Sequence, residues 1–152
     1  MPTGRDNPKN WKPTDTDVVV NGFLISAHAE YIGPGDGPVS KEWHGSEQWV
    51  IPETRWTVTL SCDGRTITTP YSQGSAHQAP PQAKWVLWSL GSDAQMGQDT
   101  FEEFCGDLGY DTDSRKAYET WQACRDMDLQ LRRFAGSANF EDFLADVAAI
   151  DS

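Results

Sequence analysis

The chain has 152 residues, of which 38% are apolar, and it carries seven Trp, six Phe, four Tyr and a formal net charge of −11. So many aromatic residues exclude a disordered chain, and the length suits one domain with a hydrophobic core. No apolar run approaches the roughly 20 residues that span a bilayer, and the start lacks a secretion-signal pattern, so we expect a cytoplasmic protein.

The N-terminal part predicts a leader followed by β structure. Residues 1–16 contain three prolines and no hydrophobic periodicity, which indicates a flexible leader. A β-rich stretch from Val18 to Ile32 follows, in which apolar and polar residues alternate. The Gly- and Pro-rich residues 33–38 then predict a loop.

A β-hairpin is the clearest local signal in the chain. Apolar residues alternate with Thr and Ser over residues 56–61, and a second β-branched run covers residues 65–69. Asp63-Gly64 between them is typical of a tight hairpin turn, because both turn positions require positive φ. Pro70 either closes the second strand or places it at a sheet edge.

After residues 80–81, a proline pair, the hydrophobic period changes from two to about 3.6. The prolines predict the start of a first short helix. Thr100 and Glu103 form a capping-box pattern that predicts a second helix over Phe101–Leu108, ending at Gly109.

Two further helices are expected. Asp113 or Ser114 caps the third, whose apolar positions share one face until Gly136 terminates it. Asn139, followed by Asp142 three residues on, starts the fourth.

The order of elements indicates an α+β fold, with strands first and helices after them. We expect an antiparallel sheet of three to four strands over residues 17–72, with Gln48–Ile51 as the optional fourth strand. Three to four helices over residues 82–150 are expected to pack on one side of it. The predicted organisation is the leader, 1–16, and a single domain, 17–152.

The Cys and His residues predict no metal centre or cofactor. Cys62, Cys105 and Cys124 are odd in number and contain no Cys-x-x-Cys pair, so we expect small, buried, reduced side chains. The three His residues share no metal-ligand spacing. Asp111–Ser114 lacks the further ligands and the correctly placed Glu of a calcium loop, so helix capping is the favoured interpretation.

The most informative feature for function is the segment from Asp93 to Asp113, which has seven carboxylates and no Lys or Arg. Its acidic residues are Asp93, Asp99, Glu102, Glu103, Asp107, Asp111 and Asp113. Such a row is either a solvated helical face or a surface for a basic partner. Carboxylates one helical turn apart are spaced on a scale similar to DNA phosphates, so the row is predicted to bind a basic protein. With only twelve Lys and Arg, direct nucleic-acid binding is not expected.

One part of the chain resembles a known group of proteins. The run TFEEFCGDLGYDTDSRKAY, Thr100 to Tyr118, continued by Ala123-Cys124, resembles a segment shared by small phage and prophage proteins. The strand at 56–60 and the polar stretch ending at residues 80–81 also resemble theirs, so the similarity covers roughly residues 52–135. The resemblance implies an acidic accessory phage protein of the host bacterial cytoplasm, a class that often inhibits host defence. It implies no catalytic residue.

Together, these features favour a phage-encoded anti-CRISPR protein that is not an enzyme. Its acidic face would occupy the basic channel in which an effector complex holds nucleic acid, with Trp43 or Trp49 as possible anchors. One alternative is a phage adaptor or regulatory protein that binds a host or virion protein. Another is a metal-dependent hydrolase using Asp107, Asp111 and Asp113.

Overall fold

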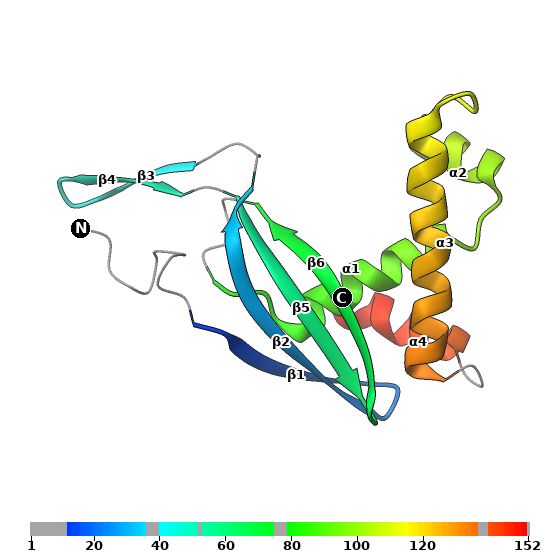
Figure 1. Cartoon of the computed structure of the whole chain (residues 1–152), viewed down its shortest axis with the longest axis horizontal. Coiled ribbons are helices and arrows are strands. Elements are labelled where there is room, and N and C mark those ends of the chain that lie inside the picture. The colour runs from blue at the N-terminus through cyan, green and yellow to red at the C-terminus, as the bar shows by residue number, and fades with distance from the viewer. Residues whose placement is uncertain (1–11, 36–39, 52, 75–78, 137–139, 152) are drawn as a thin grey trace. The chain divides into compact units, whose positions relative to one another are not determined.

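The structure, a computed structural model, describes residues 12–35, 40–51, 53–74, 79–136 and 140–151. Within these ranges the chain forms strands first and helices after them, as the sequence predicts (Figure 1). The strands are β1 (Thr14–Val20), β2 (Phe23–Pro34), β3 (Ser40–His44), β4 (Glu47–Ile51), β5 (Thr54–Cys62) and β6 (Arg65–Gln73). The helices are α1 (Ala83–Met96), α2 (Phe101–Leu108), α3 (Arg115–Ala135) and α4 (Phe140–Ala148), with a 3-10 turn at Ala149–Asp151.

The chain divides into two compact units. One comprises residues 1–18 and 25–86, and the other comprises residues 19–24 and 87–152. Most of the strands belong to the first unit, whereas the second contains most of α1 and all of α2, α3 and α4.

The main sheet is antiparallel and has the strand order β1-β2-β5-β6. In β5 every second residue is buried, from Thr54 to Cys62, because alternate side chains of a strand point to the same face. The turn from β5 to β6 has positive φ at Asp63 (48°) and Gly64 (78°), which confirms the predicted hairpin. Pro70 pairs with Thr57 inside β6, an edge strand, where the missing N–H of proline is tolerated.

A second hairpin interrupts the stretch 18–32, which was predicted as continuous β structure. Asn21 and Gly22, with φ of 52° and 82°, form the turn between β1 and β2. Asn-Gly is as strong a turn signal as Asp-Gly, because Asn tolerates the left-handed region well. Residues 14–16 belong to β1 instead of the predicted leader, and residues 1–11 lie outside the described residues.

Strands β3 and β4 form a separate two-stranded sheet with pairs from Ser40–Ile51 to His44–Glu47. The predicted optional strand Gln48–Ile51 is therefore part of β4 and does not join the main sheet. Strand β2 continues through Gly33 and Pro34, where the loop was predicted to begin, while residues 36–38 lie outside the described part.

The helical unit has a core of aliphatic and aromatic side chains. Phe104 and Cys105 of α2 pack with Ala117 and Cys124 of α3, and Met96, Phe101 and Trp121 lie against this cluster. Beyond it, α4 buries four side chains, namely Phe140, Phe143, Leu144 and Val147. Gly97, just after α1, lies so close to the Cys124 carbonyl that a Cβ at residue 97 would collide with it.

The predicted caps fix the ends of α2 and α3. The Thr100 hydroxyl accepts from the Glu103 N–H, the Glu103 carboxylate accepts from the Thr100 N–H, and both distances are 3.2 Å. Gly109 ends α2 in the left-handed region (φ 73°), and the Ser114 hydroxyl caps α3. Gly136 ends α3, whereas Asn139, the predicted start of the last helix, lies outside the described residues.

All three cysteines are buried and unpaired, as expected from the sequence. Burial raises the pKa of the Cys124 thiol to about 11, and the nearby Asp93 carboxylate adds to this effect. Of the helices that the described ranges contain, none combines the length and the apolar character needed to cross a membrane.

Candidate functional site

Five of the seven predicted carboxylates lie on α2 or on the loop from α2 to α3. All five are exposed: Glu102, Glu103, Asp107, Asp111 and Asp113. Because the capping box fixes where α2 begins, Glu103 and Asp107 are four residues apart in the same helix and lie one turn apart on its surface. We call these five residues the acidic surface.

Two members of the acidic surface also hold the local backbone in place. Glu103 completes the capping box with Thr100. The Asp111 carboxylate accepts from the Asp113 N–H at 3.2 Å. These contacts use neutral N–H donors, and in the described part of the chain none of the five carboxylates forms an ion pair. Their negative charge is therefore left for solvent or for a partner.

Asp107 lies in the last turn of α2, which contains no basic residue. The C-terminal end of a helix carries partial negative charge, so a carboxylate there costs about 0.3–1 kcal/mol at low ionic strength. The fold does not benefit from this charge at this position.

The other two predicted residues differ from the acidic surface in environment. Asp93 is half-buried in α1, and desolvation raises the pKa of its carboxyl group. Asp99 is half-buried in the connection between α1 and α2, and its backbone carbonyl accepts from Trp121 Nε1 at 2.9 Å. Asp93 therefore does not share the exposed environment of the α2 row.

Exposed apolar side chains lie beside the acidic residues in sequence. Leu108 is 48% exposed and Tyr110 is 38% exposed, and the Tyr110 ring stacks on Phe104 with centroids 6.0 Å apart. Leu108 and Tyr110 both lie between Asp107 and Asp111 in the chain. Aromatic side chains are enriched at protein–protein interfaces, where polar groups form the rim and charged residues are depleted in the core.

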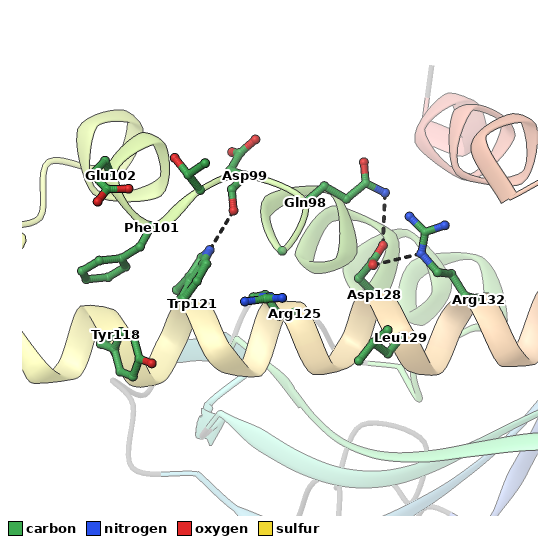
Figure 2. Close-up of a pocket in the computed structure, with 12 residues that line it drawn as sticks. Gln98, Asp99, Phe101, Glu102, Tyr118, Trp121, Arg125, Asp128, Leu129 and Arg132 are labelled. Atoms are coloured by element: carbon green, nitrogen blue, oxygen red, sulfur yellow. Dashed lines mark hydrogen bonds and ion pairs between the residues drawn. The ribbon is translucent and has the colours of Figure 1, made fainter.

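The same unit contains an open groove of about 820 Å³ beside the acidic surface. Its walls are the α1–α2 connection, the start of α2 and one face of α3 (Figure 2). Glu102 belongs both to this groove and to the acidic surface. Nothing in the sequence marks the groove except the spacing of Tyr118, Trp121 and Arg125, which share a face of α3 at helical periodicity.

Three aromatic rings form one end of the groove. The Phe101 and Tyr118 centroids are 5.4 Å apart and T-shaped, while the Trp121 centroid lies 5.4 Å from Phe101 and 5.8 Å from Tyr118. Tyr118 is 45% exposed, whereas the other two rings are partly buried. Figure 2 shows Phe101 and Trp121 on the same side of α3 as Glu102, with the Tyr118 side chain across the α3 ribbon below Phe101.

Three of the charged side chains that line the groove, namely Arg125, Asp128 and Arg132, are engaged with groups of the same unit. Asp128 accepts from Arg132 Nε at 3.0 Å and from Gln98 Nε2 at 3.1 Å. The Arg125 guanidinium lies over the Trp121 ring, 5.0 Å from its centroid (Figure 2). At this end of the groove Asp128 and Arg132 are therefore paired with each other, whereas Arg125 contacts an aromatic ring.

Among the described residues, no group of three His, Cys, Asp or Glu side chains is arranged to hold a metal ion. This includes Asp107, Asp111 and Asp113, which were considered as metal ligands from the sequence. Trp43 is 69% exposed on β3, while the side chain of Trp49 lies outside the described part.

Compared with protein-family models, curated proteins and solved structures, the chain shows no match.

Proposed function

We propose that the protein is a binding protein that docks on a basic, nucleic-acid-handling complex of a bacterial defence system and competes with nucleic acid for it. CRISPR effectors are the target class that we favour, because they hold guide and target in basic channels. The observation that carries the proposal is the acidic surface, which has five exposed carboxylates without ion pairs to the described basic residues.

The placement of Asp107 supports a role in binding. Its carboxylate lies where the helix dipole disfavours it, and no basic residue in the last turn compensates. Because the exposed Asp107 carboxylate lowers the stability of the fold, its presence is better explained by a role in binding. Electrostatic attraction would speed association and make the complex sensitive to salt.

An adaptor that binds a host or virion protein is a second candidate. The observation that favours it is Trp43, a large apolar side chain exposed on the β3–β4 hairpin and distant in sequence from the acidic surface. Binding through this side chain would depend little on salt and would not require the carboxylates.

The test combines two changes on the acidic surface. Glu103→Gln removes a charge but keeps the capping box, in which Gln is also accepted, and Asp107→Lys reverses the second charge. The double variant is expected to weaken capture of the partner from bacterial lysate about tenfold or more at low salt. Moderate salt should release the complex from the wild-type protein.

Asp146→Lys is the matched control. Asp146 is an exposed carboxylate near the end of α4, another short helix without a base in its last turn. Figure 1 shows α2 beside the start of α3 and α4 beside its end. Asp107→Lys and Asp146→Lys should both stabilise the fold by about 0.3–1 kcal/mol, but only the first should lose the partner. Undiminished binding by the double variant would reject the proposal, and salt-resistant binding lost on Trp43→Ala would favour the adaptor.

A further inference from the structure

We propose that the groove beside α3 is an arginine site, in which the guanidinium of a partner arginine lies against the Tyr118 ring and pairs with the Glu102 carboxylate. This inference rests on the proposed function, because it specifies which side chain of the basic partner is recognised. It adds a directional contact to an attraction that would otherwise depend on charge alone.

The first argument is the Tyr118 ring. It is 45% exposed, and the rings of Phe101 and Trp121 support it at centroid distances of 5.4 and 5.8 Å. Its hydroxyl accepts from Gln122 Nε2 at 3.0 Å. An aromatic ring held on a helix and open to solvent on one side is suited to stack with a planar cation.

The second argument is that the same helix already uses this contact internally. Arg125 lies over the Trp121 ring at 5.0 Å, and Arg132 lies over the Phe140 ring at 4.4 Å. Among the described cations, none lies over Tyr118. The Tyr118 ring is therefore an aromatic surface of the same kind that remains open.

The third argument is charge. Glu102 is exposed, lines the groove and forms no ion pair with a described basic residue. Arg132 is matched by Asp128 at 3.0 Å, and Arg125 covers Trp121. Three carboxylates (Asp99, Glu102 and Asp128) and two guanidinium groups (Arg125 and Arg132) line the groove, so its side chains carry a net charge of −1. Glu102 lies at the end occupied by Phe101 and Tyr118 (Figure 2).

Arginine fits this end better than lysine. Its planar guanidinium can stack on a ring while its N–H groups donate in pairs to a carboxylate. The lysine ammonium is a compact, strongly hydrated charge and cannot do both. At an exposed site the difference is expected to be about two- to fivefold in affinity.

The test compares two probes of equal charge, N-acetylated and C-amidated hexa-arginine and hexa-lysine, titrated into the full chain at low salt. The NMR signal of the Trp121 indole N–H reports on the groove. We expect hexa-arginine to bind about two- to fivefold more tightly and to shift this signal. Tyr118→Phe keeps the ring and should keep the preference, whereas Tyr118→Leu should abolish it. Trp88→Leu, at an exposed aromatic residue of α1 that does not line the groove, is the matched control and should leave the preference unchanged.

A second pair of variants does not alter the Tyr118 ring. Arg125→Ala removes a positive charge and uncovers Trp121, so it should increase the preference for hexa-arginine. Arg133→Ala removes an equally positive, exposed residue that does not line the groove. It should strengthen binding of both peptides equally. If Tyr118→Leu does not fold, comparing Arg125→Ala with Arg133→Ala still tests whether the arginine preference arises in the groove.

The outcomes separate this inference from the proposed function. Equal affinity for the two peptides, or an arginine preference that survives Tyr118→Leu, overturns the arginine site. If both peptides still bind and Asp107→Lys weakens both, the acidic surface remains supported as the binding site. If neither peptide binds, both proposals are wrong.

Discussion

His28 has two carboxylates beside its imidazole ring. Its Nδ1 lies 2.7 Å from Asp15 Oδ1, and its Nε2 lies 3.4 Å from Glu30 Oε1. The hydrogen bond with Asp15 is the main reason that the pKa of His28 is raised above its ordinary value, and the Glu30 hydrogen bond adds to it. Because Asp15 is in β1 and His28 is in β2, protonation of one ring strengthens a contact between two strands.

This contact predicts a pH dependence with a defined sign. The imidazolium is favoured in the folded state, so its stabilising effect is fully present below the ordinary His pKa of about 6.5. The effect is lost as the pH rises through the raised folded pKa. An NMR titration of the His28 ring should give a pKa above about 6.5, and Asp15→Asn should lower it more than Glu30→Gln does. An unchanged pKa in Asp15→Asn would show that this contact is absent in solution.

At the scale of elements, two glycines predict opposite effects of the same substitution. Gly97 lies against the backbone of Cys124 in α3, whereas Gly106 lies in α2 with open space where a Cβ would be. Gly97→Ala should destabilise the protein by about 1–3 kcal/mol, because two backbones must move apart. Gly106→Ala should stabilise it by about 0.5–1 kcal/mol, because alanine loses less backbone entropy in a helix.

Urea unfolding of both variants gives the two free-energy changes directly. Gly106→Ala is the matched control for the added methyl group. Equal effects of the two substitutions would mean that the close approach of residue 97 to α3 does not form.

The elements with local signals were predictable from the sequence. The capping box at Thr100, the left-handed glycine at residue 109 and the Asp63-Gly64 turn each depend on a few neighbouring residues. The Asn21-Gly22 turn has an equally local signal and could have been recognised in the same way. The β3–β4 hairpin also has a local turn, with Gly45 at φ 66° between the paired residues His44 and Glu47. That these two strands stay apart from the main sheet could not be predicted, because it depends on contacts between segments distant in sequence.

The candidate site was only partly predictable. The exposure of Glu103 and Asp107 follows from the register of a capped helix. By contrast, the partial burial of Asp93 depends on packing between different elements, with Cys124 of α3 among its neighbours. The groove requires Phe101 to meet Tyr118 and Trp121 across two helices, and no local pattern determines that contact.

For the whole molecule, the net charge of −11 predicts a dependence of stability on salt. The second half of the chain, residues 83–152, holds fourteen acidic and six basic residues, so unscreened repulsion is concentrated there. Raising sodium chloride from about 0.05 M to about 0.5 M shortens the range of this repulsion to a few ångströms. The melting temperature should therefore rise.

Differential scanning calorimetry at the two salt concentrations measures this effect. The rise should be smaller in a variant that combines Glu102→Gln, Glu103→Gln and Asp107→Asn, because part of the repulsion has been removed. A melting temperature that falls with salt would mean that attractive ion pairs, such as Arg132 with Asp128, outweigh the repulsion.

The labelling rates of the three buried thiols can report how often each part of the protein opens. Cys62 lies in the unit of strands, and Cys105 and Cys124 lie in the unit of helices. A sulfhydryl that is shielded in the native fold is labelled only when its surroundings open, so its modification rate measures how often that happens. Because the thiols are distributed over both units, labelling of the wild-type chain shows whether the two units open together or at different rates.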